Sequence, residues 1–297
     1  MRIVVILGRV LDPSGIVVNR RRGRIFVNRE EYILQPADKC ALEAALRIKD
    51  ATSAEVVALP RGPLPDGSTG PVLSRAEGLT TSDDVLRQAL AMGADRAVYF
   101  VGQVANLSNA GEAVMARALA AAVEKLGGTD LLLTGATTLD TGQSQLGPRL
   151  AEALGWPQIV GAWQVAIQRF SDSARVSESA KGKVQAVLQQ AGNYVTVEAD
   201  LPAVVTVSPG ALKPRYPDGV RLINVYRAED AVEKWDVAGL VDETALQPLL
   251  EKRGQDFPPE RELGVRLEGR PAEMARALAD ALQQWGGLSS PPERVTG

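Results

Sequence analysis

Short apolar runs alternate with amphipathic segments from residue 2 to residue 207. RIVVIL at residues 2–7 is apolar on both faces, which is typical of a central strand in a parallel sheet. Further strands are predicted at residues 54–60, 96–101, 130–135 and 203–207, and helices at 35–50, 85–95, 110–126 and 145–156. This alternation predicts an α/β fold, with a mostly parallel sheet covered by helices on both faces.

The remaining segments follow other patterns. Residues 12–32 hold two apolar-alternating pieces around a basic turn and predict a hairpin, and residues 61–82 are typical of a surface loop. Residues 159–207 are β-rich. We therefore predict an α/β domain over residues 1–207, followed by an irregular, extended arm and a terminal helix over residues 208–297.

The terminal helix is predicted at residues 271–286, with a proline at its start and Gly286 as its cap. Its apolar stripe needs a surface to cover it. Folding back on its own domain and docking on a partner subunit are both open. The stripe consists of Met274, Leu278, Ala281, Leu282 and Trp285.

Composition narrows the class of protein. The formal net charge of -3 argues against a nucleic-acid-binding domain, and no run of 18 apolar residues predicts insertion into a membrane. The first apolar run is too short for a signal peptide. A single cysteine, Cys40, excludes an internal disulfide and fits a reducing cytoplasm.

The chain contains no histidine. This excludes catalysis by Ser-His-Asp or Cys-His groups and histidine-ligated metal sites, and one cysteine cannot hold an iron–sulfur cluster. We expect no catalytic residue and no metal site, so any redox chemistry would come from a bound organic cofactor.

The best candidate for a binding site is GATTLDTGQSQLGP at residues 135–148, where a strand runs through small polar residues into a helix. Backbone amides, the hydroxyls of Thr141 and Ser144, and the helix N-terminus could donate to a phosphate. An ordinary loop capped by Asp140 or Ser144 explains the pattern equally well. Pro36, opening an earlier helix, could form a second wall.

Other motifs give little support for a further binding site. The chain has no G-x-G-x-x-G, and residues 62–69 have the glycine spacing of a phosphate loop but Ser68 in place of its lysine. The basic run at residues 20–24 is more typical of a solvated hairpin tip than of a polyanion site.

Several blocks in collinear order resemble electron-transfer flavoprotein beta subunits. LRQALAMGADRAVYF resembles the family's signature helix and strand, and LGWPQ, LPAVVTV and FPPERELGVRL also match it. RIVVILGRVLDP and QPADKCALEAALRIK match its first strand and first helix. The resemblance implies a Rossmann-like fold of the adenine-nucleotide-binding type.

The resemblance also implies a cofactor load and partners. A larger alpha subunit would carry the redox-active FAD, which this chain would shield while binding a structural AMP. Partner dehydrogenases or other oxidoreductases would exchange electrons with the heterodimer. Carried over by position, the nucleotide contacts are Ile6, Gln35, Pro36, Ala37, Asp38, Arg61, Gly135, Ala136, Thr137, Thr138, Leu139, Asp140, Thr141, Gly142, Gln143, Ser144, Gln145 and Leu146.

Departures from the family pattern leave alternatives open. The QLGP end of the loop is closer to nitrogen-fixation-type and electron-bifurcating members, in which a second FAD replaces AMP and takes hydride from NADH. A stand-alone nucleotide-binding module is a third possibility. In the family's partner-recognition segment the anchoring residue would be Val220 or Leu222, and the terminal helix with Trp285 would reach the alpha subunit.

Overall fold

The computed structural model describes most of the chain. The described residues are 1–19, 21, 24–28, 32–61, 83–101, 111–168, 182–236, 240 and 264–285. The predicted loop at 61–82 apart from Arg61, the phosphate-loop-like motif within it and most of the basic run at 20–24 therefore lie outside the described residues. The chain divides into two compact units, Met1–Arg253 and Gly254–Gly297.

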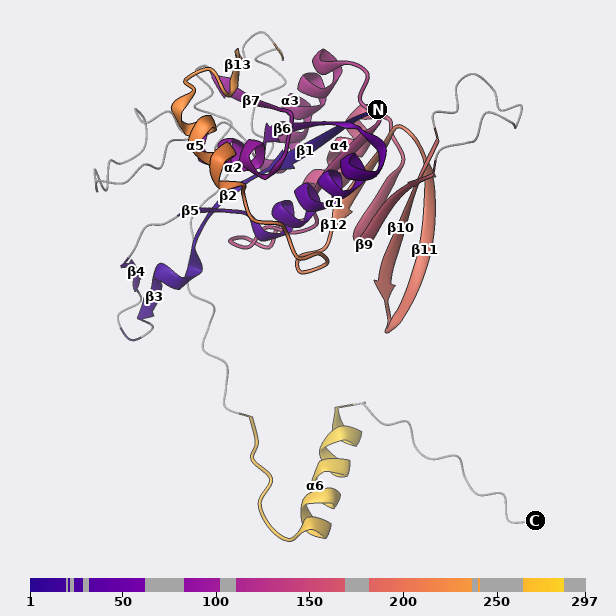
Figure 1. Ribbon diagram of the computed structural model, residues 1–297. Coiled ribbons are helices and arrows are strands. Elements are labelled where there is room, and N and C mark those ends of the chain that lie inside the picture. Colours follow the sequence, from indigo (N-terminus) through magenta and orange to yellow (C-terminus); the bar gives the residue numbers. More distant parts are fainter. Residues whose placement is uncertain are drawn as a thin grey trace, which may run out of the picture. The chain divides into compact units, whose positions relative to one another are not determined.

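A nine-stranded sheet forms the first unit, in the order β11-β10-β9-β12-β8-β1-β6-β7-β13 (Figure 1). Strands β9, β12, β8, β1, β6, β7 and β13 run parallel to their neighbours within that group. The predicted strands are confirmed. The strands of this sheet are β1 Arg2–Leu7, β6 Glu55–Pro60, β7 Arg96–Val101, β8 Leu131–Gly135, β9 Gln158–Gln168, β10 Lys183–Gln190, β11 Asn193–Asp200, β12 Ala203–Val207 and, without a counterpart in the prediction, β13 Glu233–Asp236.

Strand β1 lies at the centre of two apolar cores. Ile3, Val5 and Leu7 pack on one face of the sheet, while Val4 and Ile6 pack on the other, and all five are fully buried. Alternation along a strand sends successive side chains to opposite faces. Since both faces must be covered, this explains why RIVVIL has no polar position after Arg2.

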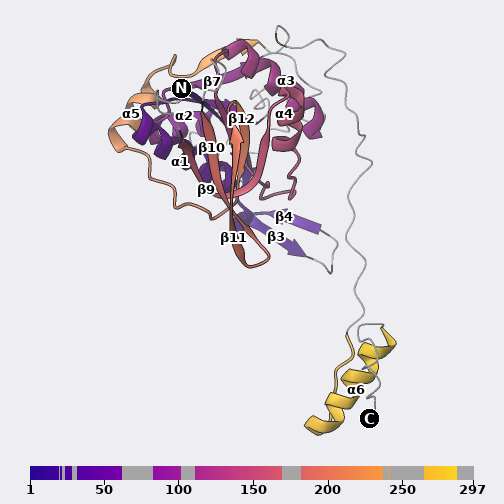
Figure 2. The ribbon, with the colours of Figure 1, turned by 90° about the vertical axis from the view of Figure 1, so that its right-hand side faces the viewer.

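Helices cover both faces of the sheet, as predicted. Helices α1, α2 and α5 lie on one side, and α3 and α4 lie on the other (Figure 2). Gln35 accepts a hydrogen bond from the Ala37 amide at the start of α1, and Gly155 ends α4 in the left-handed region. The helices are α1 Pro36–Thr52, α2 Asp84–Met92, α3 Gly111–Leu126, α4 Leu146–Leu154 and α5 Gly219–Arg227.

Strands β9, β10 and β11 form an antiparallel extension at one edge of the sheet. This confirms the β-rich prediction for residues 159–207. One face of the extension is apolar, and Val184 and Ala186 on β10 are buried in the first core.

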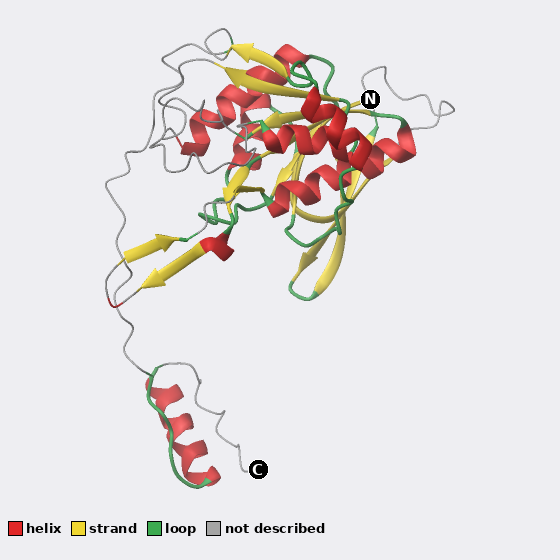
Figure 3. Ribbon diagram, turned by 60° about the vertical axis from the view of Figure 1, so that its left-hand side comes forward, coloured by secondary structure: helices red, strands yellow, loops and turns green. Residues whose placement is uncertain are grey.

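Two small ladders lie apart from the nine-stranded sheet (Figure 3). Strands β3 (Ile16–Asn19) and β4 (Arg24–Val27) form the predicted hairpin, preceded by the 3₁₀ turn Pro13–Gly15. Strand β2 (Arg9–Leu11) pairs instead with β5 (Tyr32–Leu34). The guanidinium of Arg9 lies 4.2 Å from the ring centroid of Tyr32, which favours this pairing.

The prediction of an irregular arm from residue 208 is wrong for two segments, which form a helix and a strand. Residues Gly219–Arg227 form α5, because the carboxylate of Asp218 accepts from the Arg221 amide and caps the helix. The sequence around it is rich in proline and glycine, which concealed the helical spacing. Helix α5 packs on α2, and the Tyr226 hydroxyl donates to Asp84 over 3.1 Å.

Strand β13 is the second missed element. It extends the sheet beside β7, and Arg96 forms an ion pair of 2.7 Å with Glu233 across the two strands. The hydrogen bond from Arg96 lowers the pKa of Glu233 from its usual value. The start of the predicted arm thus contributes to the first unit, while its docking on a partner subunit stays a prediction.

Helix α6, Pro271–Gln284, belongs to the second unit. Trp285 is the C-cap of the helix, and the predicted cap Gly286 lies outside the described residues. The Arg270 amide donates to Glu273 at its start. Leu278 and Trp285 are 46% and 74% exposed, so the predicted stripe is only partly covered. No helix in the described part of the chain has the length and apolar character needed to cross a bilayer.

An ion pair fastens the segment before α5 to α1. Glu43 is almost fully buried, and it accepts hydrogen bonds from the backbone and the guanidinium of Arg215, over 3.1 and 2.9 Å, and from Arg47. Burial raises the pKa of Glu43, but the hydrogen bonds from Arg215 and Arg47 outweigh burial and leave this pKa below its usual value.

We predict that Glu43→Gln lowers the free energy of unfolding by about 1–3 kcal/mol at pH 7. A lowered folded-state pKa stabilises the fold above the unfolded pKa of about 4.3, and this contribution is lost as the pH falls through the folded-state pKa. The difference from the wild type should therefore shrink in acid. Urea unfolding at pH 7 and pH 3 measures this difference in the free energy of unfolding. Glu152→Gln, at an exposed position on α4, is the control.

Candidate functional site

The carboxyl ends of three strands meet at one edge of the sheet. Gly8 follows β1, Arg61 follows β6, and Gly135 ends β8. From β1 the chain passes through α1 to β6 on one side, and it returns through α3 to β8 on the other. In open α/β sheets, ligands bind in the crevice at such a reversal of strand order.

Asp38 joins these strand ends. Its side chain is fully buried in the first turn of α1. Its two carboxylate oxygens accept from the amides of Gly8 and Gly135, over 2.8 and 2.7 Å. A Cβ on Gly135 would lie 2.5 Å from the Asp38 carboxylate and 2.7 Å from its amide nitrogen, so only glycine fits there.

We call the contacts of Asp38 with Gly8 and Gly135 the Asp38 clamp. Arg61 lies beside this clamp. Its guanidinium donates to Asp38 over 3.0 Å and to the Thr134 hydroxyl over 3.3 Å, while its own amide donates to the Leu7 carbonyl. A second guanidinium nitrogen lies 3.5 Å from the carboxylate of Glu112 on α3. Among the described residues, Nε of Arg61 has no hydrogen-bond acceptor. The guanidinium therefore has hydrogen-bonding capacity left for an anionic ligand.

The loop between β8 and α4 is closed on itself. The Thr138 amide donates to the Gln143 carbonyl over 2.9 Å, and the Gln143 amide donates back to the Thr138 hydroxyl over 3.1 Å. The hydroxyls of Thr138 and Thr141 lie 2.8 Å apart. Gly142 has a φ of +66°, which favours glycine, and no atom lies near its missing side chain.

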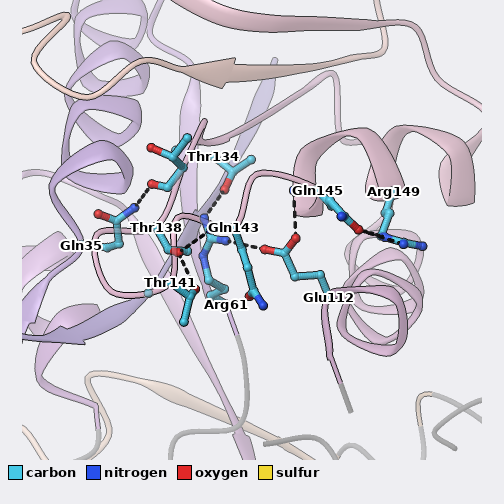
Figure 4. A network of polar contacts seen from close by, with 12 residues as sticks. Gln35, Arg61, Glu112, Thr134, Thr138, Thr141, Gln143, Gln145 and Arg149 are labelled. Carbon is cyan, nitrogen blue, oxygen red and sulfur yellow. Dashed lines mark hydrogen bonds and ion pairs between the residues drawn. The ribbon is translucent and has the colours of Figure 1, made fainter. Parts of the chain in front are cut away.

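The N-terminus of α4 faces Glu112, as Figure 4 shows. The Gln145 amide donates to the Glu112 carboxylate over 2.8 Å. The first amides of a helix have no acceptor inside it, so those of Leu146 and Gly147 are directed out of the helix start. The Gln145 side chain turns along its own helix and accepts from Arg149 over 2.9 Å.

The structure brings part of the predicted set together. The side-chain amide of Gln35 donates to the Thr137 carbonyl, which joins the start of α1 to the loop (Figure 4). Asp38, Arg61 and Gly135 are in direct contact. Pro36 and Ala37 lie in the first turn of α1, and Ala136 donates its amide to the Val207 carbonyl.

The other predicted residues have different surroundings. The Ile6 side chain is buried in the second core, which leaves only its backbone for a ligand. Residues 139–145 are exposed, and Leu139 is 47% exposed. Val220 and Leu222 lie on α5, and Trp285 lies in the second unit.

Sequence reasoning missed Glu112. It lies in the first turn of α3, the helix that follows β7. A carboxylate in the first turn of a helix at the carboxyl edge of the sheet is the only signal that could have indicated it.

The sequence of this chain is similar to a known family of proteins. Residues 24–238 match the model of the electron transfer flavoprotein domain. This chain belongs to the electron-transfer flavoprotein family. Its relatives in this family include beta subunits that it matches along nearly their whole length.

Three relatives illustrate the range of the family. The chain is 28% identical to the acryloyl-CoA reductase electron transfer subunit gamma of Anaerotignum propionicum, covering 96% of this chain and 98% of the relative. It is 27% identical to the electron transfer flavoprotein subunit beta of Bacillus subtilis (95% and 98%). It is 31% identical to the protein FixA of Azorhizobium caulinodans (81% and 80%).

We predict that Asp38→Asn lowers the free energy of unfolding by about 3–5 kcal/mol. The neutral amide would leave Glu112 as the only carboxylate beside the Arg61 guanidinium among the described residues, and would turn an NH₂ group towards a backbone amide. Chemical denaturation measures this loss. Asp50→Asn is the control, because Asp50 pairs with Arg215 at an exposed position and should cost at most about 1 kcal/mol. Equal losses for the two variants would contradict the clamp.

Proposed function

We propose that this chain is the beta subunit of a heterodimeric electron-transfer flavoprotein. It binds AMP at the carboxyl edge of its sheet and shields the FAD of a larger alpha subunit. The complex passes electrons between dehydrogenases and a quinone- or ferredoxin-linked acceptor. Membership of the flavoprotein family supports the electron-transfer role.

One observation carries the nucleotide site. The strand ends, the Arg61 guanidinium and the start of α4 converge where the order of strands reverses. The donors there are backbone amides and a guanidinium, and these are the groups that bind phosphate in proteins. The amides of Leu146 and Gly147, with Arg61, would hold the phosphate, and the small residues of the loop allow its close approach.

The residues of this chain bind and orient, and no side chain is proposed to react. FAD, when bound to the complex, supplies the redox chemistry. The nucleotide bound to this chain would hold the loop between β8 and α4 in place. Gln35 and Asp38 already join this loop to α1. A fixed edge can present one surface to the partner subunit and exclude water from it.

Counting the cofactors tests this proposal. The chain is co-expressed with its alpha subunit, and the purified complex is denatured so that its nucleotides are released. One FAD and one AMP per heterodimer are expected. Two FAD and no AMP would contradict the AMP site and support the electron-bifurcating alternative, which the QLGP end of the loop favours. A chain that is stable without any partner would contradict both.

Helix α5 presents the surface proposed for partner dehydrogenases. Val220 is 70% exposed and Ile223 is 53% exposed, whereas Leu222 is partly buried. An anchor must leave water when the partner binds, so the more exposed side chain is better placed. Of the two candidates we therefore choose Val220. Helix α6, with Trp285, is proposed to dock on the alpha subunit.

We predict that Val220→Asp slows electron transfer from the partner dehydrogenase by about tenfold or more, since the carboxylate would have to be buried in the partner's pocket. The FAD content and assembly of the complex should not change. Stopped-flow reduction of the complex by that dehydrogenase measures the rate. Val160→Asp places the same charge on β9 at a similarly exposed valine and should leave the rate unchanged. An equal effect of the two substitutions would contradict the anchor.

A further inference from the structure

The carboxylate of Glu112 occupies the place that a phosphate needs. One of its oxygens accepts from the Gln145 amide at the start of α4, over 2.8 Å. The other lies 3.5 Å from the Arg61 guanidinium (Figure 4). Arg61 is a phosphate donor in the proposed site, and the Gln145 amide directly precedes the Leu146 and Gly147 amides, so a phosphate that enters the site must compete with Glu112.

The arrangement holds more negative charge than positive. Arg61 lies between two carboxylates, those of Asp38 and Glu112, whose side chains are 0% and 12% exposed. Asp38 is fixed by two backbone amides as well as by Arg61. Glu112 has only the Gln145 amide besides Arg61 among the described residues. Of the two carboxylates, Glu112 is the one that can move away at the smaller cost.

The pairing of Glu112 with Arg61 is also incomplete. The carboxylate oxygen that faces the guanidinium has no hydrogen bond within the described residues, and neither does Nε of Arg61. Leaving a buried polar group without a partner costs about 1–3 kcal/mol. A phosphate has more acceptor oxygens and a higher charge, so it can satisfy Arg61 and the α4 amides together.

We propose that Glu112 is a resident counter-anion which holds the phosphate position until a nucleotide displaces it, and which thereby sets the affinity of the site. This inference rests on the proposed nucleotide site. Glu112 stabilises the site when it is empty by neutralising the guanidinium and the start of α4. It weakens the binding of any adenine nucleotide whose phosphate enters there.

A different role would reverse the effect. If Glu112 stayed in place and accepted a hydrogen bond from a ribose hydroxyl, it would strengthen binding, and its loss would weaken it. The sign of the change in affinity therefore distinguishes the two roles.

The test uses the complex of the full chain with its alpha subunit, refolded without nucleotide, and measures the dissociation constant of labelled AMP by equilibrium dialysis. Glu112→Gln keeps an oxygen for the Gln145 amide and removes the charge. It should tighten AMP binding by about tenfold, the size expected for removing one competing charge from a mostly buried ion pair. Glu112→Ala should shift the affinity in the same direction. Glu124→Gln, at an exposed position on α3, is the control and should leave the affinity unchanged.

Unchanged or weaker AMP binding by both Glu112 variants, beside a wild type that binds AMP, would overturn the inference and leave the proposed function standing. A wild-type complex that binds no adenine nucleotide would instead overturn the proposed function, and with it this role of Glu112. If the glutamine variant does not assemble, the alanine variant decides the sign.

Discussion

The buried carboxylate of Asp38 holds the carboxyl edge of the sheet together. It accepts from the amides of Gly8 and Gly135 and from the guanidinium of Arg61, and so links the ends of β1, β8 and β6 to the start of α1. A buried charge is tolerated only where it is paired and hydrogen-bonded. Because the Asp38 carboxylate must keep its hydrogen bond to residue 135, only glycine fits there: a Cβ would collide with the carboxylate.

The proposed nucleotide site depends on this clamp, because Asp38 positions Arg61 and Gly135, where the loop between β8 and α4 begins. Asp38 was carried over from the family as a nucleotide contact. In the structure its carboxylate is already fully occupied by the protein, which points to a supporting part in the site. The donors available to a phosphate lie next to it, at Arg61 and at the start of α4, where Glu112 competes for them.

The sequence predicts most of the fold because its strongest patterns arise from burial. A strand buried on both faces must be apolar throughout, as RIVVIL is, and the helices that cover it carry clear stops such as Gly93 and Gly155. Helix α5 and strand β13 were missed because both are short; α5 follows a segment rich in proline and glycine, and β13 lies among charged residues. Their stability comes from contacts with α2 and β7, which local patterns do not encode. The loop at residues 135–148 was proposed as a binding site because of its small polar residues, but Glu112 was not, because its contacts with Arg61 and Gln145 join residues distant in sequence.

The most direct test of the central claim is a high-resolution structure of the complex with its alpha subunit and bound nucleotide. A phosphate should lie within hydrogen-bonding distance of the Leu146 and Gly147 amides and of Arg61, with the Glu112 carboxylate displaced from the Gln145 amide. Asp38 should keep its contacts with Gly8 and Gly135. A nucleotide bound elsewhere, with Glu112 still in contact with Gln145 and Arg61, would contradict the account.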